Sequence, residues 1–171
     1  MIIALYLVCI VTANVLTASF APFSFLGLLV PYGTFFIGLN FLLRDFLQLN
    51  YGKKKTYFFI ITALILSGIT SAVLGDTLHI VYASALSFLI SELTDTEIFS
   101  ALKERYLARF IVSGVVAGTL DSVIFAVVGL YAAGFVPLSA IPNVIIGQMV
   151  VKWIMQLPVF LIYKKFKYST P

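Results

Sequence analysis

The sequence predicts an all-α membrane protein, a bundle of six transmembrane helices, and three observations support this class. Hydrophobic residues make up 61% of the 171 residues and charged residues only 11%, less than half of the about 25% typical of a soluble domain. The apolar residues form continuous runs, and ~20 such residues span a bilayer as a helix. The basic residues gather in alternate connections between these runs.

Each expected span is an apolar run bounded by turn residues. The breaks read APFSFLG, NYGKKK, LGDT, KERY and AAGFVPLSAIP in order. No Lys or Arg precedes the first run, so we expect a membrane helix there rather than a signal peptide. No break is long enough to separate domains, so we expect residues 1–171 to form a single domain. The expected spans are 2–20, 28–49, 56–75, 78–98, 107–131 and 141–163.

The basic residues predict the topology. Short loops rich in Lys and Arg stay in the cytoplasm. The connections 21–27, 76–77 and 132–140 contain no Lys or Arg. Both termini are therefore expected in the cytoplasm, and the formal net charge of +4 needs no nucleic-acid partner to explain it. The basic residues at the other connections and after the last span are Lys53, Lys54, Lys55, Lys103, Arg105, Arg109, Lys164, Lys165 and Lys167.

A 3+3 inverted repeat is one interpretation of the six spans. The stretch TANVLTASF in the first span faintly echoes SELTDTEIF in the fourth, and Asp45 then falls near the place of Asp121. Three helices per half make such repeats inverted, a design that places a transporter's site at the repeat interface.

Lys152 lies near the middle of the sixth span, about 15 Å from either end. An ionisable side chain there costs about 2.5–3.5 kcal/mol and marks a functional site by default. Gln148 and Gln156 lie four residues to either side and complete a polar stripe. Asp121, deep in the fifth span, is the expected partner of Lys152, with Ser122 as a hydrogen-bond donor. The pair either locks two helices together or belongs to a substrate site.

Spans two and four contribute four further ionisable candidates, Arg44, Asp45, Glu92 and Asp95. Arg44 is expected to extend to the cytoplasmic surface, and Asp45 to point elsewhere, because adjacent residues on a helix do not face each other. Asp45 is either inward-facing or part of a surface pair. Glu92 and Asp95 share a helix face, although Asp95 is alternatively a helix cap. Glu97 and Glu104 are expected to pair with Lys103, Arg105 or Arg109.

The remaining residues narrow the possible functions. Asn14 is the polar residue of the first span, and such residues often join helices. Gly114 and Gly118 form a GxxxG spacing, which serves internal packing or a homo-oligomer. Cys9 is the single cysteine and His79 the single histidine, so we expect no disulfide and no metal or cofactor site. The sequence contains no Walker loop and no HExxH or GxSxG motif, so we expect no enzyme.

Four segments of the sequence form a further pattern: PYGTFFIGLNFLLRDFLQLNYG, SELTDTEIFSALKER, LDSVIF and GQMVVKWIMQLPVFLIY. They resemble the vitamin uptake transporter (VUT) family, whose YhhQ-type members transport queuosine precursors. The chain departs from the pattern in having Glu92 where some members have Gln. The residues that match the family pattern are Gly33, Asp45, Glu92, Asp95, Phe99, Asp121, Ser122, Lys152 and Pro158.

The resemblance implies import of a 7-deazaguanine base such as preQ0 or preQ1 by alternating access across a prokaryotic cytoplasmic membrane. A carboxylate can accept both N–H groups of a guanine-like edge at once. Glu92 is expected to read that edge, or to help gate the substrate, from the cytoplasmic half. Asp45, Glu92 or Asp121 are candidates for a coupled proton. The expected substrate-binding residues are Asn14, Asp45, Glu92, Asp95, Asp121, Gln148 and Lys152.

Three alternatives stay open. The chain could be a substrate-capture subunit for another vitamin or nucleobase that needs a separate energising complex. It could be an intramembrane enzyme, although no catalytic set accompanies the carboxylates. It could be a structural or holin-like pore, which would not need buried carboxylates and a central lysine.

Overall fold

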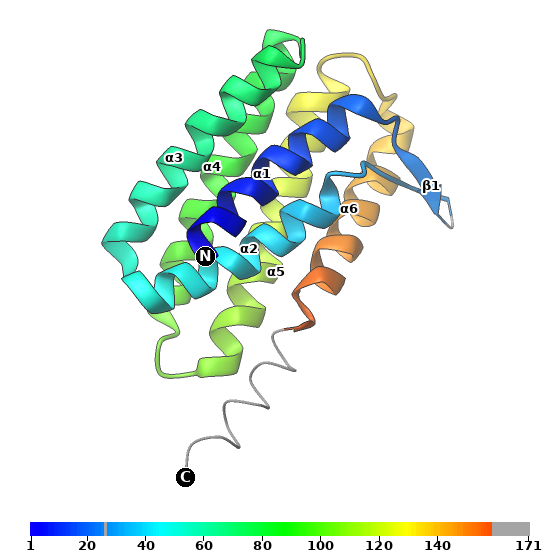
Figure 1. Ribbon diagram of the computed structural model, residues 1–171. Helices are drawn as coiled ribbons and strands as arrows, with labels where there is room; N and C mark the ends of the chain where they lie inside the picture. Colours follow the sequence, from blue (N-terminus) through cyan, green and yellow to red (C-terminus); the bar gives the residue numbers. More distant parts are fainter. Residues whose placement is uncertain (26, 159–171) are drawn as a thin grey trace.

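The computed structural model describes residues 1–25 and 27–158, which form a bundle of six α-helices and a small β-hairpin (Figure 1). Strands β1 (Phe23–Phe25) and β2 (Leu28–Val30) pair antiparallel between the first two helices. A π-helical segment, Phe125–Tyr131, continues α5, and a 3₁₀ turn, Leu138–Ala140, precedes α6. The helices are α1 (Ile2–Ser19), α2 (Thr34–Tyr51), α3 (Lys53–Val73), α4 (Leu78–Ala101), α5 (Tyr106–Ile124) and α6 (Ile141–Gln156).

The expected start of the second span at residue 28 is wrong. Residues 28–30 form β2, and α2 begins only at Thr34. Gly27 has a φ of 78°, a left-handed conformation that glycine adopts without steric cost and that a tight hairpin turn requires. Pro31 then disfavours helical backbone at Val30. Residues 159–163 of the expected sixth span, and the three lysines after them, lie outside the described residues.

Four of the helices are long and apolar enough to cross a membrane, within the described part of the chain. They are α1, α3, α5 with its π-helical continuation, and α6 with its 3₁₀ turn. The other two, α2 and α4, contain most of the charged residues that the bundle buries. The count of six spans therefore stays a prediction. The two less apolar helices, α2 and α4, direct most of their charged side chains into the bundle.

The outer face of α3 is an apolar stripe. Phe58, Ile61, Ile65 and Ile69 follow one another at spacings of three or four residues, and each is exposed. Large exposed apolar surfaces mark contact with another protein or with a membrane. The continuous stripe along a helix of 21 residues fits contact with lipid tails.

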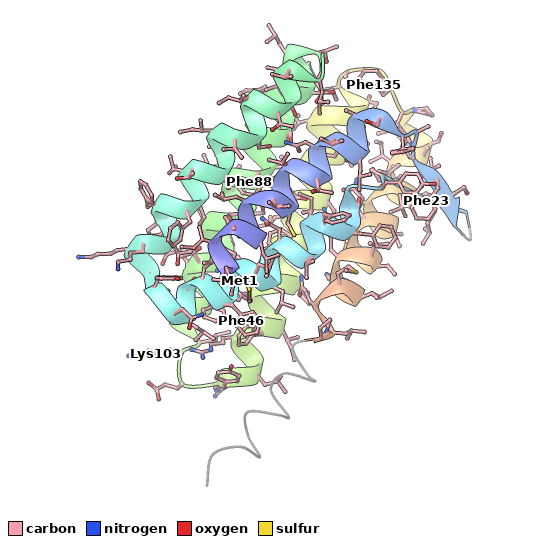
Figure 2. All side chains as sticks on the ribbon, in the orientation of Figure 1. Met1, Phe23, Phe46, Phe88, Lys103 and Phe135 are labelled. Atoms are coloured by element: carbon pink, nitrogen blue, oxygen red, sulfur yellow. The ribbon has the colours of Figure 1, made fainter. Side chains whose placement is uncertain are left out.

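The two ends of the bundle differ in charge. The α2–α3 and α4–α5 connections lie at one end, which we call the basic end, with Lys53, Lys103 and Arg105 (Figures 1 and 2). The hairpin, the α3–α4 turn and the α5–α6 connection with Phe135 lie at the opposite end and contain no Lys or Arg. The predicted alternation of basic loops therefore corresponds to two physical ends.

Small residues let α6 approach its neighbours closely. A Cβ on Gly38 of α2 would lie 2.8 Å from Met155 Cβ and 2.9 Å from Lys152 Cα. On α5, a Cβ on Gly114 would lie even closer to Gln156 Oε1, whereas one on Gly118 would make an ordinary contact, 3.5 Å from Lys152 Cβ. The GxxxG spacing therefore serves packing between α5 and α6 within this chain.

Gly38→Ala is expected to destabilise the bundle by about 1–3 kcal/mol, the usual cost of forcing a methyl group into a filled core. Gly68→Ala on α3 is the matched control, because a Cβ there meets nothing within 4 Å. That variant should be unchanged or slightly more stable. Thermal unfolding of both purified variants measures the difference, and equal melting temperatures would contradict the close α2–α6 contact.

Candidate functional site

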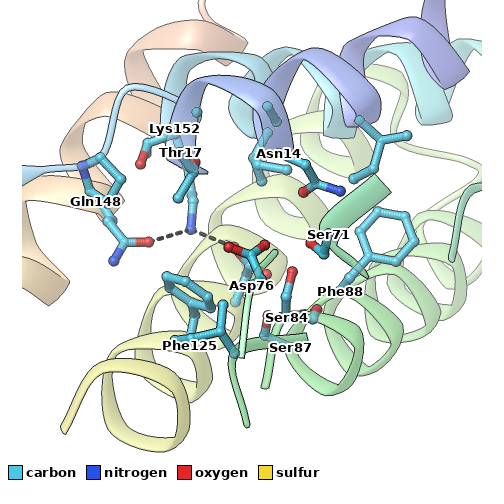
Figure 3. A pocket seen from close by; sticks show the side chains of 18 residues that line it. Asn14, Thr17, Ser71, Asp76, Ser84, Ser87, Phe88, Phe125, Gln148 and Lys152 are labelled. Carbon is cyan, nitrogen blue, oxygen red and sulfur yellow. Dashed lines mark hydrogen bonds and ion pairs between the residues drawn. The ribbon is translucent and has the colours of Figure 1, made fainter. Parts of the chain in front are cut away.

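A polar cavity lies between the six helices of the bundle, each of which contributes at least one lining residue (Figure 3). Its empty space is about 620 Å³, including the open mouth. Phe88 of α4 and Phe125 of the π-helical segment provide apolar walls. The polar residues that line it are Asn14, Thr17, Thr34, Ser71, Asp76, Ser84, Ser87, Asp121, Gln148 and Lys152.

The cavity opens toward the end that lacks Lys and Arg. A second pocket shares Thr17, Pro31 and Asp76 with it and continues past Leu29 and Phe135, which belong to that end. In the other direction the cavity reaches Phe88 and Lys152. The cavity is thus open to one end of the bundle and closed toward the basic end.

Lys152 and Asp121 form an ion pair at the inner part of the cavity. Lys152 Nζ lies 2.5 Å from Asp121 Oδ2, and the lysine side chain is 1% exposed. Nζ also donates to Ser122 Oγ at 2.9 Å and to Gln148 Oε1 at 3.2 Å. The prediction that Lys152 neutralises Asp121 is confirmed, and Ser122 accepts from the lysine while donating to Gly118 O at 2.6 Å.

Gln148 presents an unpartnered donor beside the cavity that it lines. Lysine can only donate, so the amide oxygen of Gln148 must face Lys152 Nζ, and its Nε2 group points elsewhere. Nε2 is buried and has no hydrogen-bond partner among the described residues. Gln156, the other glutamine of the stripe, donates to Gly114 O at 3.2 Å instead. A buried donor without a partner is costly, and a ligand acceptor in the cavity would satisfy it.

Asn14 joins two helices and also lines the cavity. Its Nδ2 donates to Ser67 O at 3.1 Å and to Ser67 Oγ at 2.8 Å, which ties α1 to α3. Both donor protons are thereby engaged. The expectation that Asn14 joins helices is therefore confirmed, and its position in the cavity wall is compatible with a second role.

Asp76 was not expected at the site. It lies in the turn between α3 and α4 and lines both the cavity and its outer continuation. Its carboxylate has no ion-pair partner among the described residues, unlike that of Asp121. The sequence stretch LGDT indicates only a turn, and nothing in its spacing reveals that the turn closes over the mouth of a cavity. The serines of α4 were missed for a similar reason, because a small polar residue in a span carries little signal.

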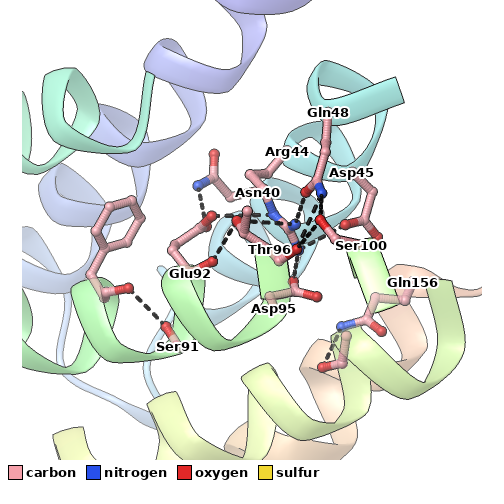
Figure 4. A network of polar contacts seen from close by, with 12 residues as sticks. Asn40, Arg44, Asp45, Gln48, Ser91, Glu92, Asp95, Thr96, Ser100 and Gln156 are labelled. Atoms are coloured by element: carbon pink, nitrogen blue, oxygen red, sulfur yellow. Dashed lines mark hydrogen bonds and ion pairs between the residues drawn. The ribbon is translucent and has the colours of Figure 1, made fainter. Parts of the chain in front are cut away.

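A second polar cluster surrounds Arg44 (Figure 4). The guanidinium lies 2.7 Å from Asp45 and 3.4 Å from Glu92, and it forms a still closer ion pair with Asp95. It also donates to Gln48 Oε1 at 2.9 Å. Arg44 is fully buried, so it joins α2 to α4 through charge.

Four expectations about these charges are wrong. Arg44 does not extend to the surface, because three carboxylates hold its guanidinium inside the bundle. Asp45 does not point away from Arg44, because the long arginine side chain folds back and pairs with it at 2.7 Å. Asp95 caps no helix, because α4 continues past it to Ala101. Glu97 pairs with Lys53 at 2.7 Å rather than with the α4–α5 loop, since α3 packs against that face of α4.

The expected substrate-binding residues thus fall into two groups. Asn14, Asp121, Gln148 and Lys152 line the cavity. Asp45, Glu92 and Asp95 do not line it and instead surround Arg44. Glu92 lies one helical turn beyond Phe88 on α4, so the Arg44 cluster lies between the floor of the cavity and the basic end.

The comparison with protein families identifies the chain. A family model described as "Putative vitamin uptake transporter" matches residues 68–164, more than half of the sequence. The chain belongs to the vitamin uptake transporter family. The match contains Glu92, Asp95, Asp121 and Lys152, which lie in motifs that carried the resemblance in the sequence. Neither the curated proteins nor the solved structures contain a match.

Membership in this family agrees with the fold. The long apolar helices and the match to a transporter family together indicate a multi-pass membrane protein. The family is one of putative transporters, which suggests a transport protein rather than an enzyme.

Proposed function

We propose that this vitamin uptake transporter imports a queuosine precursor, a 7-deazaguanine base such as preQ0 or preQ1, by alternating access. The observation that carries the proposal is the polar cavity with aromatic walls, which holds a buried ion pair and an unpartnered amide donor in a family of vitamin transporters. The proposal covers the substrate, the mechanism and the membrane, which is the cytoplasmic membrane of a prokaryote.

The chemistry of the cavity matches a flat base. The faces of a deazaguanine ring suit Phe88 and Phe125, which both line the cavity. Its carbonyl oxygen suits the free Nε2 donor of Gln148. Its two neighbouring N–H groups suit a carboxylate in bidentate geometry. Asp76 is the favoured acceptor, because one oxygen of Asp121 is already bound to Lys152.

Orientation in the membrane follows from the basic loops. Lys and Arg favour the cytoplasmic side, which places the basic end inside and the mouth of the cavity outside. The conformation is then outward-open, as expected for an importer before it takes up substrate. The Arg44 cluster closes the inner side, and its ion pairs between α2 and α4 must separate for the substrate to leave.

This arrangement changes the roles proposed for three residues. Asp45, Glu92 and Asp95 hold the inner closure through Arg44 rather than touch the substrate in the outward-open state. Asn14, Asp121, Gln148 and Lys152 remain the proposed substrate-binding residues, and Asp76 joins them.

Ligand binding to the purified protein tests the substrate class. A ligand that binds the native state raises its apparent stability, by about 2.7 kcal/mol at a concentration 100 times Kd. We expect preQ0 or preQ1 to raise the melting temperature, and biotin to leave it unchanged. Gln148→Leu should abolish the shift while keeping the fold, because it removes only the weak hydrogen bond from Lys152.

Ser113→Ala is the matched control. Its hydroxyl is buried on α5 without a hydrogen-bond partner and does not line the cavity. This variant should keep the full response to the deazaguanines. A shift with biotin but not with preQ0 or preQ1 would overturn the proposed substrate, and an equal shift in Gln148→Leu would overturn the proposed site. Co-purification of ATPase subunits would instead support a capture subunit.

A further inference from the structure

The Arg44 cluster contains more negative than positive charge. Asp45, Glu92 and Asp95 surround one guanidinium, and the four side chains are between 0% and 3% exposed. With every group ionised, the cluster would hold one positive and three negative charges. Buried charge without a partner is strongly unfavourable. Binding of a proton relieves the imbalance.

The neighbouring charges reduce the imbalance without removing it. On α5, Arg109 lies within electrostatic reach of Asp45, and Asp121 lies within reach of Glu92. Asp121 is already neutralised by Lys152 of α6. With Arg109 counted in full, one negative charge remains. The basic and acidic groups at the α3–α4 contact do not help, because Lys53 and Tyr57 pair with Glu97.

A metal ion is not the fitting occupant. No group of three His, Cys, Asp or Glu side chains among the described residues is arranged to hold one. The guanidinium of Arg44 already occupies the position between the carboxylates. A proton needs no such space.

Geometry selects Glu92 as the proton's site. It is the carboxylate that Arg44 holds least closely, at 3.4 Å against 2.7 Å for Asp45. Asn40 Nδ2 donates to Glu92 Oε1 at 3.4 Å, and Asn40 Oδ1 is buried without a hydrogen-bond partner among the described residues. The Tyr6 hydroxyl is buried close by. A protonated carboxyl carries an O–H donor. Protonated Glu92 can therefore act as a donor in this buried cluster, where Asn40 Oδ1 lacks one.

We propose that Glu92 binds a proton in the outward-open state and releases it to the cytoplasm when the Arg44 cluster separates. The proton reaches Glu92 from the floor of the cavity, one helical turn away at Phe88. Only the O–H bond of the carboxyl forms and breaks, and one proton moves inward per cycle. This inference rests on the proposed function for its link to import, and its tests use no substrate.

Infrared absorption detects the bound proton directly. The wild-type protein at neutral pH should show the C=O band of a protonated carboxyl, shifted in D2O. Glu92→Gln should lose this band, and Glu97→Gln, an exposed carboxylate paired with Lys53, should keep it. If Glu92→Gln does not fold, Glu92→Asp serves instead, and it should shift the frequency of the C=O band. A band that neither Glu92 variant changes would overturn the proposal.

Release of the proton on opening is measured with an introduced thiol. Ser100 bonds Gln48 at the edge of the cluster toward the basic end, so Ser100→Cys reports inner opening. Both thiols are introduced into a Cys9→Ala background, and the measured quantity is the maleimide reaction rate of Ser100→Cys divided by that of the exposed control Lys103→Cys. This ratio should rise with pH, by at most about tenfold per pH unit if one proton is released. Added Glu92→Gln should remove this rise.

A flat ratio in the wild-type background would overturn the proposal. A merely structural Glu92 would change stability but give neither the infrared band nor the pH-dependent opening. Because no deazaguanine enters either experiment, failure of the substrate assignment and failure of the proton site are separate results.

Discussion

Arg44→Ala is expected to abolish stable folding or to lower stability by about 3–5 kcal/mol, the cost of removing one partner from a buried ion pair. The substitution leaves Asp45, Glu92 and Asp95 inside the bundle without the cation that pairs with all three, and it also removes the hydrogen bond to Gln48. A loss of this size is a large fraction of the stability of a typical domain. Thermal unfolding of the purified variant, or its yield from membranes, measures the effect.

Lys53→Ala provides the matched comparison. Lys53 also pairs with a carboxylate between neighbouring helices, but both partners are exposed to solvent at the basic end. An exposed pair contributes little, so this variant should unfold close to the wild type. If Arg44→Ala were as stable as Lys53→Ala, the buried cluster would not hold α2 to α4, and the proposed inner closure would lose its basis.

Lys152→Met is expected to cost a similar amount, about 3–5 kcal/mol, and to remove substrate binding as well. It leaves Asp121 without its cation and frees the oxygen of Gln148 that now accepts from the lysine. The double variant Asp121→Asn with Lys152→Met removes both charges. It should recover most of the stability, because an uncharged pair of similar size is often neutral for folding.

The double variant separates the structural role from the functional one. Recovered stability without a melting shift from preQ0 or preQ1 assigns the pair to the substrate site. Recovered stability with a full shift would show that Lys152 and Asp121 only lock α5 to α6. Continued instability of the double variant would contradict the view that the unpaired charge causes the loss.

Much of the bundle follows from the sequence because lipid imposes simple rules. Apolar runs and alternating basic loops place the helices and the two ends. The ion pair of Lys152 and Asp121 is predictable because a deep lysine needs a partner and few are available. The Arg44 cluster is harder to predict, because an arginine near a helix end can also extend to the surface. Only the packing of α4 against α2 decides between the two.

The cavity itself could not be predicted from residue types. Glu92 and Asp95 look like site residues by their chemistry, yet they lie beyond the cavity floor, around Arg44. Asp76 looks like a turn residue, yet it lines the cavity mouth. Both differences arise from how helix ends are placed in three dimensions. The hairpin after α1 was missed as well, because three-residue strands leave little pattern.

Uptake of labelled preQ1 into proteoliposomes that contain only this protein tests the central claim most directly. We expect saturable uptake that unlabelled preQ0 competes and biotin does not. The double variant of Asp121 and Lys152, reconstituted to the same density, should give the level of empty vesicles. Uptake of preQ1 no faster than into empty vesicles, by a protein that still melts cooperatively, would contradict the assignment as a queuosine-precursor importer.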